Sequence, residues 1–255
     1  MLTSGSGQSD DSFGSQVAID GLTAIVGAPH DDENGDRAGA AYVFKRDGGS
    51  WIRTKILASD GEGGWDGCHC ADLFGSSVAI SNDRAIIGAT GAGNHYGWED
   101  SGAAYIYQYD GSTWAETKLI PSVCDVESNQ FGYSVSISGN KAIVGAYLCN
   151  MAVLYHFDGS DWVESQTMWG TSDNPSPSIG FYFGISVSIS GNIAIVGEDS
   201  EEADYDEPAG DCDSAYIYFL EDEHWIKKAQ LVPTVSPYLN AFLVFPFASL
   251  IIPQS

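Results

Sequence analysis

The stretch FGYSVSISGNKAIVGAY at residues 131–147 decides the fold, because the chain contains four versions of it. The others are FGSQVAIDGLTAIVGAP from residue 13, FGSSVAISNDRAIIGAT from residue 74 and FGISVSISGNIAIVGED from residue 183. In every copy the glycine after the phenylalanine lies 13 residues before a later glycine. Self-similarity of this kind indicates repeated structural units. The residues that define the repeat are Phe13, Gly14, Gly27, Phe74, Gly75, Gly88, Phe131, Gly132, Gly145, Phe183, Gly184 and Gly197.

Each of these stretches is predicted to form a β-hairpin. In the third copy the dipeptide Gly139-Asn140 suits a two-residue primed turn. That turn pairs Ile137 with Ala142 and Val135 with Val144 on one face, and apolar or small residues also occupy the other face. A strand pair of this kind has to be covered on both sides.

A second block follows each hairpin and predicts another one. The blocks are AAYVFKRDGGSW, AAYIYQYDGSTW, AVLYHFDGSDW and SAYIYFLEDEHW, and three of them turn at an Asp-Gly pair. Each unit then forms a four-stranded antiparallel sheet that is sandwiched between its neighbours, which describes a blade of a β-propeller. We expect the closing tryptophans to pack between blades; they are Trp51, Trp114, Trp162 and Trp225.

The pairing of Phe-Gly with a later Gly-Ala-Pro resembles the FG-GAP repeat, which builds the β-propeller at the N-terminus of integrin α chains. Gly-Ala-Pro is complete in the first copy and becomes Gly-Ala-Thr, Gly-Ala-Tyr and Gly-Glu-Asp in the later ones. The resemblance covers residues 13 to about 232. It implies an all-β propeller, a setting outside the cell or at its surface, and a role in binding.

The calcium loop that many FG-GAP repeats carry is absent. In the family the loop reads Asp-x-Asn-x-Asp-Gly-x-x-Asp and lies between the Phe-Gly and the Gly-Ala-Pro. Here that connection has only four residues in each copy, at 20–23, 81–84, 138–141 and 190–193, and none offers three spaced oxygen ligands. The calcium sites of the family therefore cannot be transferred to these positions.

The expected organisation is a flexible N-terminus at 1–9, a propeller at 10–232 and an apolar tail at 233–255. The repeats span about 13–60, 74–121, 131–170 and 183–232. Four blades could close into a small ring or form an arc of a larger one. The tail could complete a blade, bind a partner as a strand, or be the truncated end of a longer product; truncation, with further blades missing, is favoured because integrin-like propellers have more than four.

The charge of the chain excludes several classes of function. It has 35 acidic and 10 basic residues, with a formal net charge of -25. A nucleic-acid binder needs a basic surface, and so does a protein that docks on anionic lipid. The longest apolar run, 239–252, is shorter than the roughly 20 residues of a membrane-spanning helix, and the first residues do not read as a signal peptide.

Most of the acidic residues fall in segments that an antiparallel blade gathers at one end. These segments hold 22 of the 35 acids and one base, Arg37; they are residues 28–40, 58–73, 89–103, 121–130, 146–151, 167–182 and 198–214. Long loops on a rigid scaffold are the usual place for binding surfaces. The predicted ligand-binding residues are Asp31, Asp32, Glu33, Asp36, Glu99, Asp100, Glu201, Glu202, Asp204 and Asp206.

A cation is an alternative ligand for these carboxylates, because Ca²⁺ binds six to eight oxygen atoms. The alternation Asp32, Asn34, Asp36 is the candidate site, although Arg37 replaces the glycine of a tight calcium loop. The same segments contain all five cysteines, whose disulfide state the sequence leaves open; they are Cys68, Cys70, Cys124, Cys149 and Cys212.

We therefore expect a non-enzymatic scaffold that binds a protein or glycan ligand through its acidic long loops, without a certain cofactor. No nucleophile elbow, zinc-binding helix, phosphate loop or dinucleotide fingerprint is present in the sequence. The alternatives are a glycan-active enzyme that uses loop carboxylates and a purely structural repeat domain. Such an enzyme would need two carboxyl groups about 5 to 9 Å apart in a pocket.

Overall fold

The structure is a computed structural model that describes residues 3, 10–61, 71–92, 101–123, 130–170, 181–200 and 213–232. The predicted flexible N-terminus, apart from residue 3, and the apolar tail at 233–255 lie outside the described residues.

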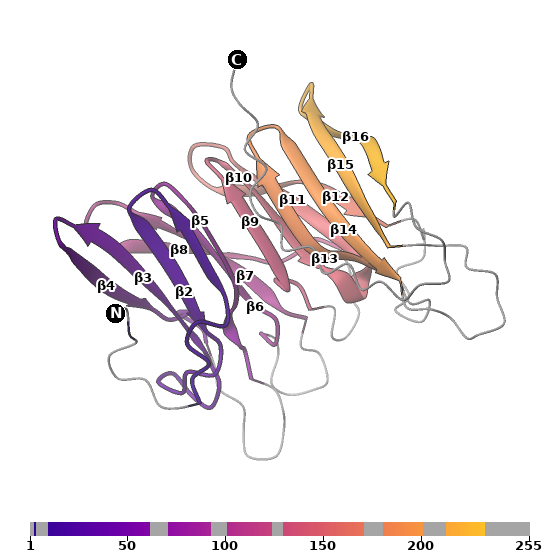
Figure 1. Cartoon of the computed structure of the whole chain (residues 1–255). Coiled ribbons are helices and arrows are strands. Elements are labelled where there is room, and N and C mark those ends of the chain that lie inside the picture. Colours follow the sequence, from indigo (N-terminus) through magenta and orange to yellow (C-terminus); the bar gives the residue numbers. More distant parts are fainter. Residues whose placement is uncertain are drawn as a thin grey trace.

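The described residues form four antiparallel sheets of four strands each, and the prediction of an all-β propeller built from such blades is confirmed (Figure 1). Within each sheet the strands lie in the order of the sequence. The strands of blade 1 are β1 (Val17–Asp20), β2 (Thr23–Ala28), β3 (Ala40–Asp47) and β4 (Ser50–Ile56). Those of blade 2 are β5 (Phe74–Ser81), β6 (Arg84–Ala89), β7 (Ala103–Tyr109) and β8 (Trp114–Leu119).

Blades 3 and 4 repeat this arrangement. Blade 3 contains β9 (Ser134–Ser138), β10 (Lys141–Ala146), β11 (Met151–Phe157) and β12 (Trp162–Trp169), with a short 3-10 turn η1 (Tyr147–Cys149) between β10 and β11. Blade 4 contains β13 (Phe181–Ser190), β14 (Ile193–Ser200), β15 (Ser214–Glu221) and β16 (His224–Leu231).

The predicted hairpin register is confirmed. Ile137 pairs with Ala142 and Val135 with Val144, and the turn between them contains Gly139 with a positive φ of 59°. In the second hairpins of blades 2 and 3 an aspartate closes the turn. Asp110 accepts backbone N–H bonds from Ser112 and Thr113, and Asp158 accepts the equivalent bonds in blade 3.

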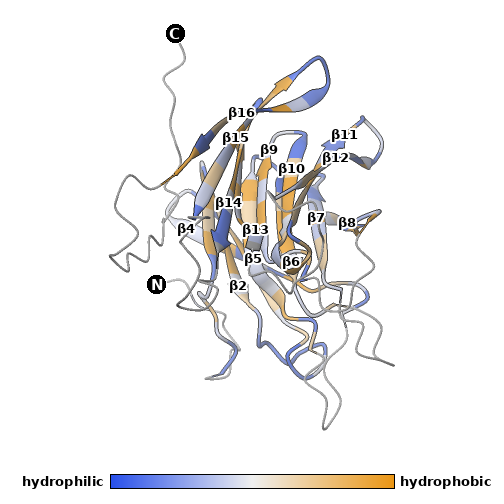
Figure 2. Cartoon of the chain, turned by 90° about the vertical axis from the view of Figure 1, so that its right-hand side faces the viewer, coloured by the Kyte–Doolittle hydropathy of each residue, from blue (hydrophilic) through white to orange (hydrophobic). Residues whose placement is uncertain are grey.

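The hydrophobic core lies between the blades. At each junction the back face of one sheet packs on the front face of the next, and the two faces together form one buried apolar cluster. At the first junction, Ile25 and Val43 of blade 1 meet Val78 and Ile80 of blade 2. Figure 2 shows these apolar stretches along the inner strands of the sheets.

The Phe-Gly pair of the repeat has two packing functions. The Phe74 ring packs edge-on against Tyr105 of its own blade, at a centroid distance of 5.4 Å. The carbonyl oxygen of the glycine that follows lies against the later glycine of the preceding blade: a Cβ added at Gly27 would be 2.1 Å from the oxygen of Gly75. The two glycines are therefore required because two backbones approach each other closely.

The four blades form an arc and do not close into a ring, which settles the alternative left open by the sequence. At the repeat position occupied by tryptophan, Trp162 and Trp225 are buried between blades, whereas Trp51 of blade 1 is 38% exposed. Trp114 is partly buried against the first junction. The expectation that tryptophans pack between blades thus holds for the three blades that follow another blade, and not for blade 1. No helix among the described residues is long and apolar enough to cross a membrane.

Candidate functional site

In every blade, the loop between the second and third strands lies at one end of the sheet (Figure 1). The chain enters the first strand and leaves the fourth strand at that same end. We call this the long-loop end. Here a short parallel bridge from Gly39 to Phe74 joins blades 1 and 2, and one from Gly102 to Phe131 joins blades 2 and 3. The described acidic loop residues therefore lie at the same end of their blades.

Asp31 is the most enclosed of the predicted site residues. It follows β2, is buried, and accepts hydrogen bonds from the Tyr42 hydroxyl at 2.8 Å and from Lys55 Nζ at 2.7 Å. Burial alone would raise the pKa of Asp31, but the bonds from Lys55 and Tyr42 outweigh it and hold the pKa below its ordinary value. Lys55 also pairs with Glu33 at 2.5 Å, so one lysine neutralises two loop carboxylates.

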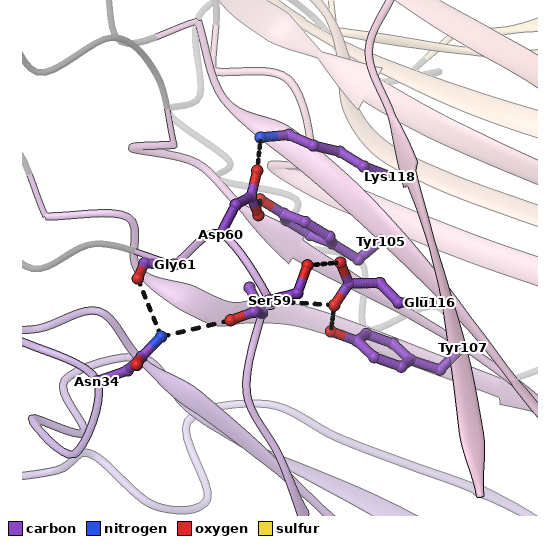
Figure 3. A network of polar contacts seen from close by, with 9 residues as sticks. Asn34, Ser59, Asp60, Gly61, Tyr105, Tyr107, Glu116 and Lys118 are labelled. Carbon is purple, nitrogen blue, oxygen red and sulfur yellow. Dashed lines mark hydrogen bonds and ion pairs between the residues drawn. The ribbon is translucent and has the colours of Figure 1, made fainter.

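A second carboxylate of this kind lies between blades 1 and 2 (Figure 3). Asp60 follows β4 and accepts hydrogen bonds from the Tyr105 hydroxyl at 2.9 Å and from Lys118 Nζ at 2.6 Å, both on blade 2. Burial would raise the pKa of Asp60, and the bonds from Lys118 and Tyr105 instead lower it. Burial and the Asp60 charge raise the pKa of the Tyr105 hydroxyl, which stays protonated as a donor.

The connection between blades is held by a second, repeated contact. Glu116 of β8 accepts hydrogen bonds from the Ser59 backbone N–H (3.0 Å), the Ser59 hydroxyl (2.5 Å) and the Tyr107 hydroxyl (2.5 Å) (Figure 3). At the next junction Glu164 of β12 accepts equivalent bonds from the backbone and side chain of Ser122. These carboxylates therefore fix the path of the chain from one blade to the next.

The calcium candidate Asp32, Asn34 and Asp36 is partly occupied by contacts inside the protein. The Asn34 side-chain amide donates to the carbonyl oxygens of Ala58 (3.3 Å) and Gly61 (2.9 Å), and Figure 3 shows the bond to Gly61. Asp32 accepts a bond from the backbone N–H of Arg37 at 2.8 Å. Across the described ranges, no group of three or more carboxylate, histidine or cysteine side chains is placed to hold a metal ion.

Blades 3 and 4 vary the arrangement. In blade 4 the Tyr216 hydroxyl donates to Glu198 at 2.5 Å, and Gln230 takes the place of the lysine. In blade 3 Val153 and Thr167 stand at the positions of the tyrosine and the lysine. The loop before β11 is short. At the earlier junctions the N–H of the repeat phenylalanine donates to a backbone carbonyl of the preceding blade's loop. At the third junction the Phe183 N–H donates to Asn150 Oδ1 instead.

The structure thus places four of the ten predicted binding residues. Asp31, Asp32, Glu33 and Asp36 lie on the loop between β2 and β3, where Asp31 is buried and the other three are exposed. The remaining six lie outside the described residues: Glu99, Asp100, Glu201, Glu202, Asp204 and Asp206.

Sequence reasoning did not identify the residues that neutralise the loop carboxylates. In blades 1 and 2 the tyrosine of Ala-Ala-Tyr faces a lysine on the neighbouring strand, Tyr42 opposite Lys55 and Tyr105 opposite Lys118. In both copies the lysine follows the tyrosine by 13 residues. That repeated spacing in the sequence could have identified the two lysines as partners of the loop carboxylates.

The FG-GAP repeat family matches residues 1–44, 52–107 and 114–153, which together are more than half of the chain. No curated protein matches. Among solved structures, a chain from a Saccharomyces cerevisiae assembly of Dbp5 with Nup159, Gle1, IP6 and ADP is similar over 83% of this chain, with 10% identity and a TM-score of 0.43. The match spans 46% of that chain.

Proposed function

The chain belongs to the FG-GAP repeat family, whose propellers are typically interaction domains, and on that premise we propose that it is a non-enzymatic binding module for a protein or glycan ligand. The ligand contacts the exposed carboxylates of the long-loop end. The observation that carries this proposal is that the long-loop end has two kinds of carboxylate, one engaged inside the protein and one facing solvent.

The engaged carboxylates make the loops rigid. Asp31, Asp60 and Glu116 each accept two or more hydrogen bonds, and Asn34 joins the blade 1 loop to the connection at 58–61. A surface that is already ordered loses less conformational entropy when a ligand binds. This supports the long-loop end, among the surfaces of the arc, as a binding surface.

The solvent-facing carboxylates supply the attraction. Asp32 and Asp36 are exposed on a loop of blade 1 that also carries the exposed Arg37, and Lys55 on β4 is already paired with Asp31 and Glu33. A surface of one sign raises the association rate of a ligand of the opposite sign, and salt weakens the effect. Of the two ligand classes, a protein with a basic patch is favoured by this charge.

A location outside the cell is part of the proposal. Cys149 is disulfide-bonded, and the other four cysteines lie outside the described residues. Disulfides persist mainly in oxidising compartments, which include the extracellular space. The family membership supports the same location, because FG-GAP repeats are commonly extracellular.

The test is a binding screen of the chain against an array of basic secreted proteins and a glycan array. One variant neutralises five carboxylates of the long loops: Asp36→Asn, Glu201→Gln, Glu202→Gln, Asp204→Asn and Asp206→Asn. A matched control neutralises five carboxylates near the hairpin turns at the opposite end: Asp20→Asn, Asp47→Asn, Asp83→Asn, Asp222→Asn and Glu223→Gln. Both variants change the formal net charge from -25 to -20, so they differ only in where the charge is removed.

We expect at least one array member to bind the unmodified chain and the control, and to bind the long-loop variant at least about tenfold more weakly, with the difference shrinking in salt. Equal weakening in both variants would mean that only net charge matters, and would contradict a localised site. Binding that survives in the long-loop variant would place the ligand elsewhere on the arc.

A further inference from the structure

Three tyrosines gather at the long-loop end, where blade 3 meets blade 4. Tyr133 lies just before β9, Tyr147 belongs to η1, and Tyr182 is on β13 of blade 4. The ring centroids of Tyr133 and Tyr147 are 4.5 Å apart, and those of Tyr147 and Tyr182 are 5.4 Å apart. We call these three residues the tyrosine cluster.

The repeat does not require the tyrosine cluster. At the position of Tyr133 the other blades have serine or isoleucine, and at that of Tyr147 they have proline, threonine or aspartate. At the position of Tyr182 they have serine, leucine or glutamine. The cluster is therefore a feature of this one junction and not of the FG-GAP blade.

Packing uses only part of the tyrosine cluster. Tyr133 is 41% exposed and is the one exposed tyrosine among the residues that the structure describes. Tyr147 and Tyr182 are half-buried. The loop that carries Tyr147, between β10 and β11, has only four residues, so blade 3 has no long loop of its own to cover the cluster.

Other tyrosines of the chain show what their rings attract. Four of them each have a lysine of this chain 5.0 to 5.4 Å from the ring centroid: Tyr42, Tyr105, Tyr109 and Tyr216. A cation at such a distance is attracted by the negative face of the ring. All ten lysines and arginines belong to the described residues, and none of them lies over the ring of Tyr133 or Tyr147. A lysine at these two rings therefore has to come from another molecule.

The charge at the tyrosine cluster also favours a cation. Asp199 of β14 lies directly opposite Tyr182 of β13 in the antiparallel register, and it is exposed. Residues that are directly opposite share one face of the sheet, with their Cβ atoms about 5 Å apart. The whole chain has a formal net charge of -25. A neutral glycan gains nothing from this charge, whereas a basic side chain does.

We propose that the tyrosine cluster binds a lysine side chain of the basic protein ligand, with the ammonium group over the exposed Tyr133 ring and Asp199 supplying a carboxylate at the Tyr182 end. The inference rests on the proposed function, because it names the group of that ligand which the long-loop end recognises. The loop carboxylates attract the ligand over a distance, and the tyrosines act only on contact. Tyrosine is among the residues that contribute most to binding energy at protein interfaces.

The experiment uses a fluorescently labelled peptide of eight lysines as the probe. Fluorescence anisotropy measures its binding to the full chain in about 0.15 M NaCl, where long-range attraction is screened. The decisive variant is Tyr133→Leu, which keeps the net charge and an apolar side chain but removes the aromatic ring, and Tyr133→Phe restores the ring. The matched control is Trp51→Leu, because Trp51 is similarly exposed, at 38%, but lies on β4 near a hairpin turn.

We expect the unmodified chain, Tyr133→Phe and Trp51→Leu to bind the octalysine peptide equally well. Tyr133→Leu should bind it about two- to fivefold more weakly, because one cation–π contact at an exposed site is lost. Its melting temperature should be unchanged, since Tyr133 is exposed. The same peptide with all its lysines acetylated should not bind, because it has no cation to place over the ring.

Equal affinity of Tyr133→Leu and Tyr133→Phe overturns the inference, as does failure of the octalysine peptide to bind the unmodified chain. If that equality is found while the long-loop carboxylate variant still binds more weakly than its control, only the tyrosine cluster is excluded and the proposed function stands. Weaker binding by Tyr133→Leu, with equal binding by the two carboxylate variants, supports the cluster and contradicts the acidic surface. A neutral glycan that loses affinity in Tyr133→Leu while octalysine does not would overturn the inference in favour of a sugar-stacking surface.

Discussion

Ile80 and Ile19 occupy the same position of the repeat in neighbouring blades, and their surroundings differ almost completely. Ile80 is 8% exposed between blades 1 and 2, whereas Ile19 is 69% exposed on the front of the arc. The same contrast separates Gly145 from Gly197 and Trp225 from Trp51. An FG-GAP blade therefore carries the residues of two interfaces whether or not both are occupied, and the terminal copies show which residues serve the interface alone.

The largest expected difference is between the two isoleucines. Ile80→Ala leaves a cavity between two sheets and should lower the free energy of unfolding by about 2–5 kcal/mol. Ile19→Ala removes a solvent-exposed side chain and should change it by less than about 0.5 kcal/mol in dilute protein. Urea denaturation of both variants measures the two changes in the free energy of unfolding. Equal losses would mean that Ile19 is buried in solution at that concentration.

The two glycines give the next largest difference. Gly145→Ala forces a methyl group against the Gly184 carbonyl and should cost about 1–3 kcal/mol, because the two backbones must separate. Gly197→Ala has ordinary van der Waals room and should be close to neutral. Thermal unfolding at low protein concentration tests this. A large loss of stability in Gly197→Ala would show that another segment packs against Gly197.

Enclosed and open positions also differ within one loop. Asp31→Asn should destabilise the chain by about 1–3 kcal/mol, because it removes the buried charge that pairs with Lys55 and accepts the Tyr42 bond. Asp36→Asn, on the exposed part of the same loop, should change stability by less than about 0.5 kcal/mol. Denaturant titration of the two variants at pH 7 compares them directly, and a reversed order would contradict the role of Asp31 as an anchor.

A smaller effect is expected from pH. The pKa of Asp31 is lowered in the folded chain, so its stabilising contribution is present above the ordinary value of 3.8 and is lost as the pH falls through the folded pKa. The pKa of Lys55 is raised, because its bonds to Asp31 and Glu33 outweigh its burial, so its contribution is lost only above the ordinary value of 10.5. The stability difference between the unmodified chain and Asp31→Asn should therefore shrink below pH 3.8 and stay constant from pH 5 to 9. A difference that is unchanged at pH 3 would assign the effect of the substitution to shape rather than to charge.

The smallest expected effect is that of divalent cations on the long-loop end. Gathered carboxylates repel one another, so the melting temperature should rise with NaCl as the Debye length falls from about 30 Å at 0.01 M to about 10 Å at 0.1 M. At matched ionic strength, millimolar CaCl₂ should add little beyond MgCl₂. A large calcium-selective increase that Asp32→Asn with Asp36→Asn abolishes would reveal a site at Asp32, Asn34 and Asp36.

The candidate site was predictable only in outline. The acidic loops and their common end follow from the order of strands in the repeat. The role of each carboxylate does not follow from the strand order, since Asp31, Asp32 and Asp36 are all aspartates of the same loop. Asp31 is enclosed because Tyr42 and Lys55 of the neighbouring strands reach it, and Asn34 turns toward the connection at 58–61. Such contacts join residues 11 to 27 positions apart, beyond any local pattern.

By itself the sequence determined the blade. Alternating apolar residues, the Gly139-Asn140 turn and four copies of one pattern fix strand, register and repeat, because each of these is a property of adjacent residues. Only the tertiary structure decided that the blades form an open arc, that Trp51 and Ile19 are exposed while their equivalents are buried, and that lysines neutralise the loop acids. Burial and charge pairing depend on what packs against a residue, and a repeat pattern is the same whether or not a neighbour is there.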